Sequence, residues 1–289
     1  MNTKEIVKKY NIRPTKSLGQ NFLIDDGVIK RIAASADISR KDLVIEVGPG
    51  IGSLTRELAE RAGKVVAVEI DRHLIPAFLD NMKDFPNVEL IHEDILRVNA
   101  GEVVHKVRAG GEGDLRDVKV VGNLPYYITT PIIMKFLEEN PGIKAMVFMV
   151  QKEVAERMVA KPGGKDYGAL SVAVQYYSLP QRLFEVAPHC FIPQPDVYSS
   201  VIRLDILKTP PVALLDREIF FKTVKAAFGQ RRKTLLNALH NSGIFTGDKE
   251  SLKKALEDMG IDAGRRGETL TIEQFAQISN ALSKKTVGL

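Results

Sequence analysis

Short apolar runs alternate with amphipathic stretches along the chain from residue 41 onward. The apolar runs are rich in Val, Ile and Leu, as buried strands are, and occupy residues 43–47, 65–69, 88–92, 118–122 and 145–150. Helical spacing of apolar side chains marks residues 53–62, 72–83 and 130–139. Strands that alternate with helices predict βαβ units joined by right-handed crossovers. We therefore expect an α/β fold with a doubly wound parallel sheet.

The pattern changes after residue 161. The loop KPGGKDYG leads into a predicted helix at 169–179, and two β-rich runs at 182–186 and 201–207 are expected to form a hairpin at the end of the sheet. Residues 98–117 are polar and glycine-rich, and we interpret them as a surface insertion before the fourth strand, without a catalytic role. The α/β region is thus predicted to extend to residue 207.

The paired prolines Pro210 and Pro211 indicate a linker, because proline resists continuing either a helix or a strand. Beyond them only helical patterns appear, at 217–229, 231–242, 249–259 and 271–283. A chain of 289 residues is long enough for one large domain and a smaller companion. We predict an α/β domain of residues 1–207 and a small all-helical domain of residues 208–289.

Composition excludes several classes of protein. The single cysteine, Cys190, rules out an internal disulfide, and five scattered histidines give no metal-ligand spacing, so we expect no metal. No apolar run approaches the ~20 residues that span a bilayer, and residues 1–14 lack the apolar core of a signal peptide. We expect a cytoplasmic protein without membrane contact, and a monomer, because no heptad pattern is present.

The basic residues are concentrated at the two ends of the chain. The net charge is only +5, but residues 1–20 hold five Lys or Arg against one Asp or Glu, and residues 209–289 hold thirteen against nine. The total charge by itself is typical of an ordinary solvated surface. Its concentration at both ends favours a polyanionic partner.

A glycine-rich turn, EVGPGIGSLT, follows the first predicted strand and opens the first helix. Gly48, Gly50 and Gly52 permit a tight turn against which a ligand can lie. The dinucleotide fingerprint requires a further glycine where this chain has Ser53, which favours a smaller, nucleoside-like ligand over a pyrophosphate. Glu69 ends the second strand, where a carboxylate can accept both ribose hydroxyls, and Asp94 follows the third strand, where it can accept from an adenine amino group.

The tetrapeptide Asn123-Leu124-Pro125-Tyr126 follows the fourth strand and is the most specific pattern in the chain. The Asn side-chain oxygen and the Leu124 carbonyl can accept the two hydrogens of an exocyclic adenine nitrogen and draw it toward tetrahedral geometry. Tyr126 offers a flat face for an extruded base, and Pro125 stiffens the turn. The tetrapeptide resembles the pattern that adenine and other amino-nitrogen methyltransferases use, which implies methyl transfer from a sulfonium donor with positioning as the main source of catalysis.

Five segments together resemble the bacterial ribosomal RNA adenine dimethyltransferases. They are KSLGQNFL at 16–23, EVGPGIGSLT at 46–55, NLPY at 123–126, FIPQPDVYSS at 191–200 and FGQRRKTL at 228–235. The resemblance spans nearly the whole chain, and it implies a Rossmann-like class I methyltransferase sheet. The chain departs from the family pattern at Ser17-Leu18, where an Arg and an aromatic residue are frequent, and in the length of the 98–117 segment.

The resemblance also implies roles for particular residues. S-adenosyl-L-methionine would be the cofactor, bound by Asn21, Leu23, Gly48, Gly50, Glu69, Asp94 and Asn123. Phe191 would form a second aromatic wall of the base pocket, opposite Tyr126, and would join residues 123–126 as catalytic. Lys16, Arg231, Arg232 and Lys233 would bind RNA phosphates. The implied reaction places two methyl groups on each of two adjacent adenines near the 3′ end of small-subunit (16S) ribosomal RNA, during maturation of the small subunit.

Three alternatives remain open at this point. An erythromycin-resistance-type methyltransferase shares the fold and chemistry but modifies large-subunit RNA, and that family typically lacks the segments at 191–200 and 230–235. An RNA-binding assembly or transcription factor could keep this fold without catalysis, although the intact NLPY speaks against it. A nicotinamide dehydrogenase is disfavoured by Ser53 and by the absence of a proton relay.

Overall fold

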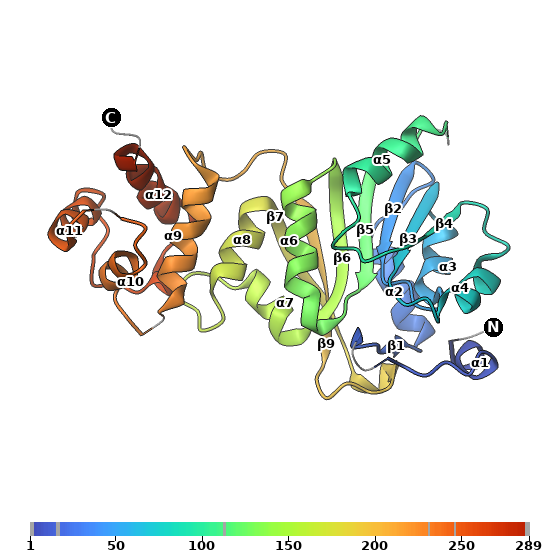
Figure 1. Ribbon diagram of the computed structural model, residues 1–289. Helices are drawn as coiled ribbons and strands as arrows, with labels where there is room; N and C mark the ends of the chain where they lie inside the picture. The colour runs from blue at the N-terminus through green and yellow to red at the C-terminus, as the bar shows by residue number, and fades with distance from the viewer. Residues whose placement is uncertain (1–2, 16–17, 112–113, 231, 246, 287–289) are drawn as a thin grey trace. The chain divides into compact units, whose positions relative to one another are not determined.

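The computed structural model describes residues 3–15, 18–111, 114–230, 232–245 and 247–286 (Figure 1). The chain divides into two compact units. Unit 1 comprises Met1–Ala155 and Leu179–Ile206, and unit 2 comprises Glu156–Ser178 and Leu207–Leu289. The second segment of unit 2 begins at Leu207, one residue before the predicted start at 208, and residues 156–178 group with the C-terminal helices, whereas we expected them in the α/β region.

Unit 1 is built on a seven-stranded sheet of order β4-β3-β2-β5-β6-β9-β7. Its strands are β2 (Asp42–Val47), β3 (Lys64–Glu69), β4 (Val88–His92), β5 (Asp117–Asn123), β6 (Ile143–Gln151), β7 (Ser178–Val186) and β9 (Ser199–Ile206). The first five pair in parallel, whereas β9 pairs antiparallel with β6. The predicted doubly wound α/β fold is confirmed, and the two β-rich runs extend one end of the sheet as expected.

The central strands are covered on both faces. Every residue of β2 and β3 is buried, which is the burial pattern of a parallel sheet with helices on each side. The helices α2 (Asp26–Ser35) and α3 (Ser53–Ala59) pack on one face through Ile32, Leu54 and Leu58, against strand residues such as Val44. The helices α5 (Ala100–Ala109) and α6 (Thr129–Glu139) contact each other on the other face (Figure 1). The helix α4 (Ile75–Met82) connects β3 to β4.

The helix α5 corrects the interpretation of residues 98–117 as a surface insertion. Asn99 caps its first turn by accepting from the backbone N–H of Glu102, and Val103, Val104 and Val107 are buried. These three valines form an apolar stripe at helical spacing that the surrounding charged residues obscure. The segment is therefore the crossover helix that a parallel β4–β5 connection requires.

Besides α5, three further α-helices and two short strands among the described residues were not predicted. The helices are α1 (Thr3–Lys9), α2 and α7 (Lys152–Val159). The strands β1 (Phe22–Leu23) and β8 (Phe191–Ile192) form a separate antiparallel pair, with Phe22 opposite Ile192 and Leu23 opposite Phe191. Two-residue strands carry no periodicity, so only the folded chain reveals their pairing.

Unit 2 has its own hydrophobic core. It contains α8 (Ala169–Tyr177), α9 (Arg217–Gly229), α10 (Leu235–Asn241), α11 (Lys249–Asp258) and α12 (Ile272–Thr286), so the four predicted C-terminal helices are present. Tyr167 and Tyr176 are buried against this helical core, and the Tyr176 ring lies 5.3 Å from that of Phe220. This aromatic packing is why residues 156–178 belong with the C-terminal helices. Within the described residues, no helix has both the length and the apolarity to cross a bilayer.

Candidate active site

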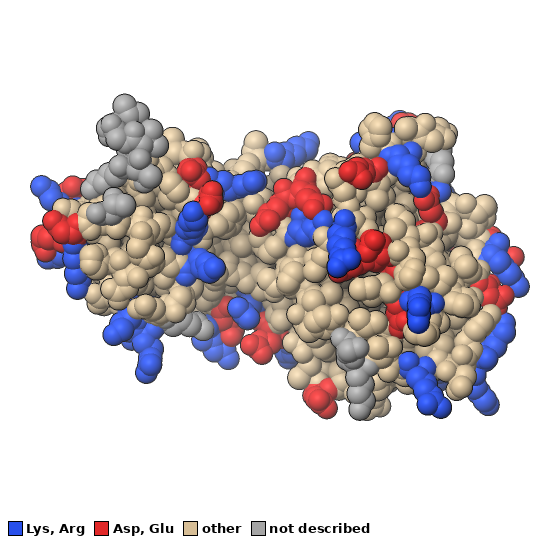
Figure 2. Space-filling model, in the orientation of Figure 1, with Lys and Arg blue, Asp and Glu red and all other residues tan. Residues whose placement is uncertain are grey.

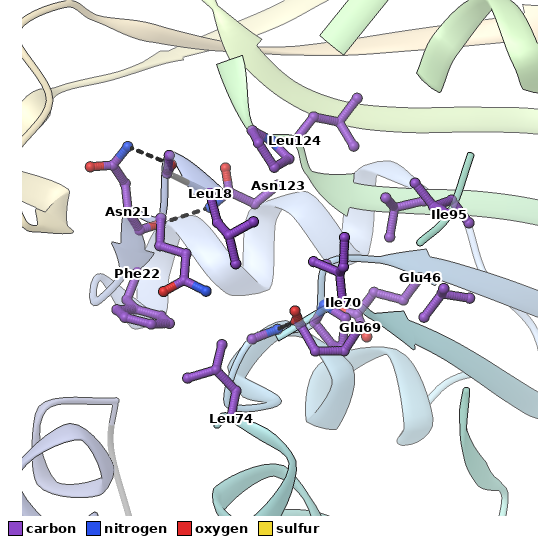
Figure 3. Close-up of a pocket in the computed structure, with 18 of the residues that line it drawn as sticks. Leu18, Asn21, Phe22, Glu46, Glu69, Ile70, Leu74, Ile95, Asn123 and Leu124 are labelled. Carbon is purple, nitrogen blue, oxygen red and sulfur yellow. Dashed lines mark hydrogen bonds between the residues drawn. The ribbon is translucent and has the colours of Figure 1, made fainter. Parts of the chain in front are cut away.

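The predicted site residues of the α/β region, apart from Lys16 and Phe191, meet at one edge of the sheet. Parallel strands present their carboxyl ends on the same side, so the turns after β2, β3, β4 and β5 converge there. They line a cavity of about 250 Å³ in unit 1 (Figure 3). The predicted residues among its walls are Asn21, Leu23, Gly48, Gly50, Glu69, Asp94, Asn123, Leu124, Pro125 and Tyr126.

The glycine-rich turn needs glycine at specific positions. Gly50 has φ +59° and Gly52 has φ +86°, a region that residues with a Cβ rarely adopt. A Cβ on Gly52 would lie 3.1 Å from Cε of Met82 and 3.3 Å from Cδ2 of Phe78, so packing as well as backbone conformation excludes a larger residue. The turn lines the cavity and leads directly into α3, which begins at Ser53.

Glu69 links the glycine-rich turn to the end of β3. Its carboxylate accepts the backbone N–H of Gly50 at 3.0 Å through Oε2 and that of Asp71 at 2.8 Å through Oε1. Burial raises the pKa of Glu69, and backbone donors at Asp71, Gly50 and Ile70 oppose that rise. A carboxylate has about four acceptor positions, so these bonds leave capacity to accept a ribose hydroxyl.

Glu46, at the end of β2, also lines the cavity but was not predicted as a site residue. It is 1% exposed, and its Oε2 has no hydrogen-bond partner among the described residues. Burial raises the pKa of Glu46 to about 8; the nearby Glu69 carboxylate adds to this rise, while the Thr55 hydroxyl opposes it. A buried, unpartnered carboxyl is costly. It therefore marks a position where a bound ligand can supply a donor or a positive charge.

The part of the cavity wall that follows β3 and β4 combines the Asp94 carboxylate with exposed apolar side chains. Asp94 accepts the backbone N–H of Leu96 at 2.9 Å through Oδ1, which leaves Oδ2 without a described partner. Ile70 and Leu96 line the cavity although they are 48% and 38% exposed, and the buried Ile95 lies with them. Apolar surfaces beside a free carboxylate oxygen suit a flat heterocycle with an amino group. The sequence pointed to Asp94 but not to these apolar side chains.

The N-terminal segment covers one side of the cavity. Asn123 donates from Nδ2 to the backbone carbonyl of Asn21 at 3.1 Å, as the dashed line in Figure 3 shows. Gln20 donates to Oδ2 of Asp71 at 2.8 Å, and Thr15 donates to the same oxygen at 3.3 Å. The backbone N–H of Asp71 also donates to the Glu69 carboxylate. Asp71 therefore links the N-terminal segment to the carboxylate that can accept ribose hydroxyls. Lys16 lies outside the described residues.

The tetrapeptide 123–126 presents two free acceptors. Since Nδ2 of Asn123 is committed to Asn21, its Oδ1 remains without a partner among the described residues. The backbone carbonyl of Leu124 is likewise unpartnered, whereas that of Pro125 accepts from Ile128 and Thr129. Oδ1 of Asn123 and the Leu124 carbonyl can therefore receive the two hydrogens of an amino group. The Tyr126 hydroxyl, 2.6 Å from Oγ of Ser199, holds the adjacent ring in place.

Phe191 does not line the cavity, contrary to the expected second aromatic wall. Its side chain is 1% exposed and packs in the core of unit 1 with Leu23 and Val201. The β1–β8 pairing places Phe191 opposite Leu23, so the ring is used for packing. The described aromatic residues that do line the cavity are Phe22, Tyr126 and Tyr127.

The predicted phosphate-binding run lies in unit 2, between α9 and α10. Arg232 and Lys233 are exposed, and Arg231 lies outside the described residues. The backbone N–H of Lys233 donates to the carbonyl of Gln230 at 2.8 Å, and α10 begins only at Leu235. The predicted start of this helix at residue 231 is wrong. Thr234 is its N-cap.

Comparison with known proteins identifies the family. The model of the ribosomal RNA adenine dimethylase family matches residues 11–284. Proteins named ribosomal RNA small subunit methyltransferase A are 55% identical in Alkaliphilus oremlandii and 53% identical in Clostridioides difficile, each over 98% of this chain and 96% of the relative.

Solved structures show the same fold. A dimethyladenosine transferase from Plasmodium falciparum superposes with a TM-score of 0.74 at 23% identity, covering 92% of this chain and 98% of that one. The 23S rRNA methyltransferase ErmE gives a TM-score of 0.67 at 27% identity, covering 91% of this chain and all of the other. The resemblance drawn from the five sequence segments is confirmed, and the chain belongs to the ribosomal RNA adenine dimethylase family.

Proposed function

We propose that this rRNA adenine dimethyltransferase uses S-adenosyl-L-methionine to dimethylate the exocyclic nitrogens of two adjacent adenines near the 3′ end of small-subunit ribosomal RNA. The observation that carries the proposal is a pair of free acceptors, Oδ1 of Asn123 and the Leu124 carbonyl. They lie at a cavity in which the Glu69 carboxylate can accept ribose hydroxyls. The relatives above 50% identity, named as small-subunit enzymes, support this RNA over the large-subunit RNA of the resistance-type enzymes.

The cofactor fits the groups that line the cavity. Glu69 would accept the ribose hydroxyls, and Asp94 would accept from the adenine amino group between Ile70 and Ile95. The unpartnered Glu46 Oε2 suits a ligand that carries positive charge. Asn21 and Leu23 would hold the cofactor from the N-terminal side. When bound, the cofactor supplies a methyl group on a positively charged sulfur, which is an excellent leaving group.

The chain's own residues prepare the acceptor nitrogen. Asn123 Oδ1 and the Leu124 carbonyl accept its two hydrogens, which localises the nitrogen lone pair and orients it toward the donor. Tyr126 carries the extruded base on its ring face. Each transfer forms a nitrogen–carbon bond, breaks a sulfur–carbon bond and releases one proton. Neither an amide oxygen nor a peptide carbonyl can hold that proton, so it leaves to water.

RNA binding outside the cavity would come from the basic residues. On the face drawn in Figure 2, Lys and Arg groups alternate with acidic ones, so phosphate contacts there would be local. We assign such a contact to Arg232 and Lys233, and by extension to Lys16 and Arg231. Residues 208–289 would thus act as the RNA-binding domain of a cytoplasmic monomer, and residues 1–207 as the methyltransferase domain.

The test is methyl transfer from labelled S-adenosylmethionine to small ribosomal subunits that lack adenine methylation, with large subunits as the matched control. Products are identified by nucleoside mass. Dimethyladenosine on the small subunit alone is the expected result. Label on the large subunit instead would assign the enzyme to the other RNA, and cofactor binding without any transfer would refute the proposed activity.

A further inference from the structure

Tyr127 lines the cavity beside Tyr126 but has no part in the proposed chemistry. Its side chain is 57% exposed, although it belongs to the wall of a mostly apolar cavity. Its hydroxyl makes no hydrogen bond with any of the described residues. A large aromatic ring that is partly exposed to solvent at the edge of this cavity has a face available for a ligand.

The backbone holds Tyr126 and Tyr127 in different directions. Residues Tyr126–Ile128 form one 3₁₀ turn, in which successive side chains point about 120° apart because there are three residues per turn. Tyr126 is fixed through its hydroxyl to Ser199. The Tyr127 ring lies along Gly19 instead, where an added Cβ would be 3.3 Å from its Cδ1 and 3.5 Å from its Cε1. The N-terminal segment thus holds the second ring in place without covering it.

The segment that supports Tyr127 also carries positive charge. Lys4, Lys8 and Arg13 are exposed on residues 3–15 of this N-terminal segment, where they can meet an RNA phosphate backbone. Aromatic faces beside basic groups are how proteins hold single-stranded nucleotides, because every base has a face that can stack.

We propose that Tyr127 is a stacking platform for the nucleotide next to the target adenine. Tyr127 directly follows Tyr126 in the chain, and both residues line the cavity. This inference rests on the proposed function, since it requires an extruded base in the cavity. It gives adjacent adenines a specific use, because the adenine on the Tyr127 side of the target stacks on this ring while the target reacts.

The experiment is a binding cycle that needs no turnover. An RNA oligonucleotide carrying the two adjacent adenines, and a second one with the neighbouring adenine made abasic, are titrated against the enzyme loaded with the demethylated cofactor product. Wild type should bind the abasic RNA about 5- to 100-fold more weakly. Tyr127→Ala should bind both RNAs equally and weakly. Tyr127→Phe should behave as wild type, and Tyr127→Leu should behave as the alanine variant.

Tyr198 provides the matched control, since it is 51% exposed but does not line the cavity. Tyr198→Ala should retain the full discrimination between the two RNAs. Unchanged cofactor affinity in each variant shows that its site is folded. Equal discrimination in wild type and Tyr127→Ala would overturn the inference. If wild-type enzyme methylates neither subunit, the proposed function fails instead, which is a separate result.

Discussion

Replacing Asn123 by alanine separates chemistry from cofactor binding. The change removes Oδ1, which faces the acceptor nitrogen, and Nδ2, which donates to the Asn21 carbonyl at 3.1 Å. Loss of one preorganised group at a centre of developing charge typically lowers kcat by about 10²- to 10³-fold. The lost bond to Asn21 is worth about 0.5–1.5 kcal/mol, so cofactor affinity should fall by about tenfold at most.

The assay measures kcat at saturating cofactor with undermethylated small subunits, and cofactor Kd by calorimetry. Asn123→Asp is the matched variant, because it keeps an acceptor oxygen but cannot donate to Asn21. It should lose less kcat than the alanine variant while weakening the cofactor at least as much. If Asn123→Ala keeps kcat within twofold of wild type, Asn123 does not prepare the amine. A loss that lies wholly in Kd would mean that Asn123 only secures the N-terminal segment.

Three further predictions concern stability and RNA binding. The Glu46 carboxyl has an ordinary pKa of 4.5 and a folded pKa of about 8, so folding takes up a proton between these values and the wild type loses stability as pH rises. The free energy of unfolding of Glu46→Gln, relative to wild type, should therefore rise by about 1.4 kcal/mol per pH unit across this window. Urea unfolding of the cofactor-free protein measures it. An equal difference between variant and wild type at pH 5 and pH 8 would contradict the raised pKa. Gly52→Ala should lower stability by about 1–3 kcal/mol, because φ is +86° and its Cβ would meet Met82; an unchanged thermal midpoint would show that the turn relaxes freely. Joint substitution of Arg232 and Lys233 by Ala should weaken RNA binding at all sequences and reduce the slope of log K against log salt by about 2, whereas an unchanged slope would remove both from the phosphate contacts.

The sequence predicted the parts of the site that topology determines. Once parallel strands are inferred from apolar runs, their carboxyl ends must meet, so Glu69, Asp94 and Asn123 could be placed together before any coordinates. Glu46 was passed over because a strand residue in an apolar run gives no sign of whether its carboxyl lacks a partner. The apolar wall at Ile70 was missed for the same reason, since exposure beside a cavity leaves no periodic trace.

The errors came from tertiary packing and from masked periodicity. Phe191 was placed by its motif in the base pocket, but pairing of β8 with β1 directs its ring into the core. The stripe of valines in α5 is hidden by neighbouring glycines and charges, so the sequence pattern of this crossover helix indicated a surface insertion. Residues 156–178 were assigned to the α/β region by sequence continuity, although Tyr176 packs against Phe220 far along the chain.

The pairing of Phe22 with Ile192 has a consequence for biosynthesis. The strand β1, which contains Phe22, leaves the ribosome early, but its partner β8 is made about 170 residues later. At bacterial and eukaryotic elongation rates this delay is roughly ten to thirty seconds. During that interval the nascent chain can form the glycine-rich turn and the first five sheet strands, but the N-terminal cover has no strand to pair with. The N-terminal cover therefore gains its partner strand only after about two thirds of the chain has been made, and a nascent chain should not retain its methyl donor before then.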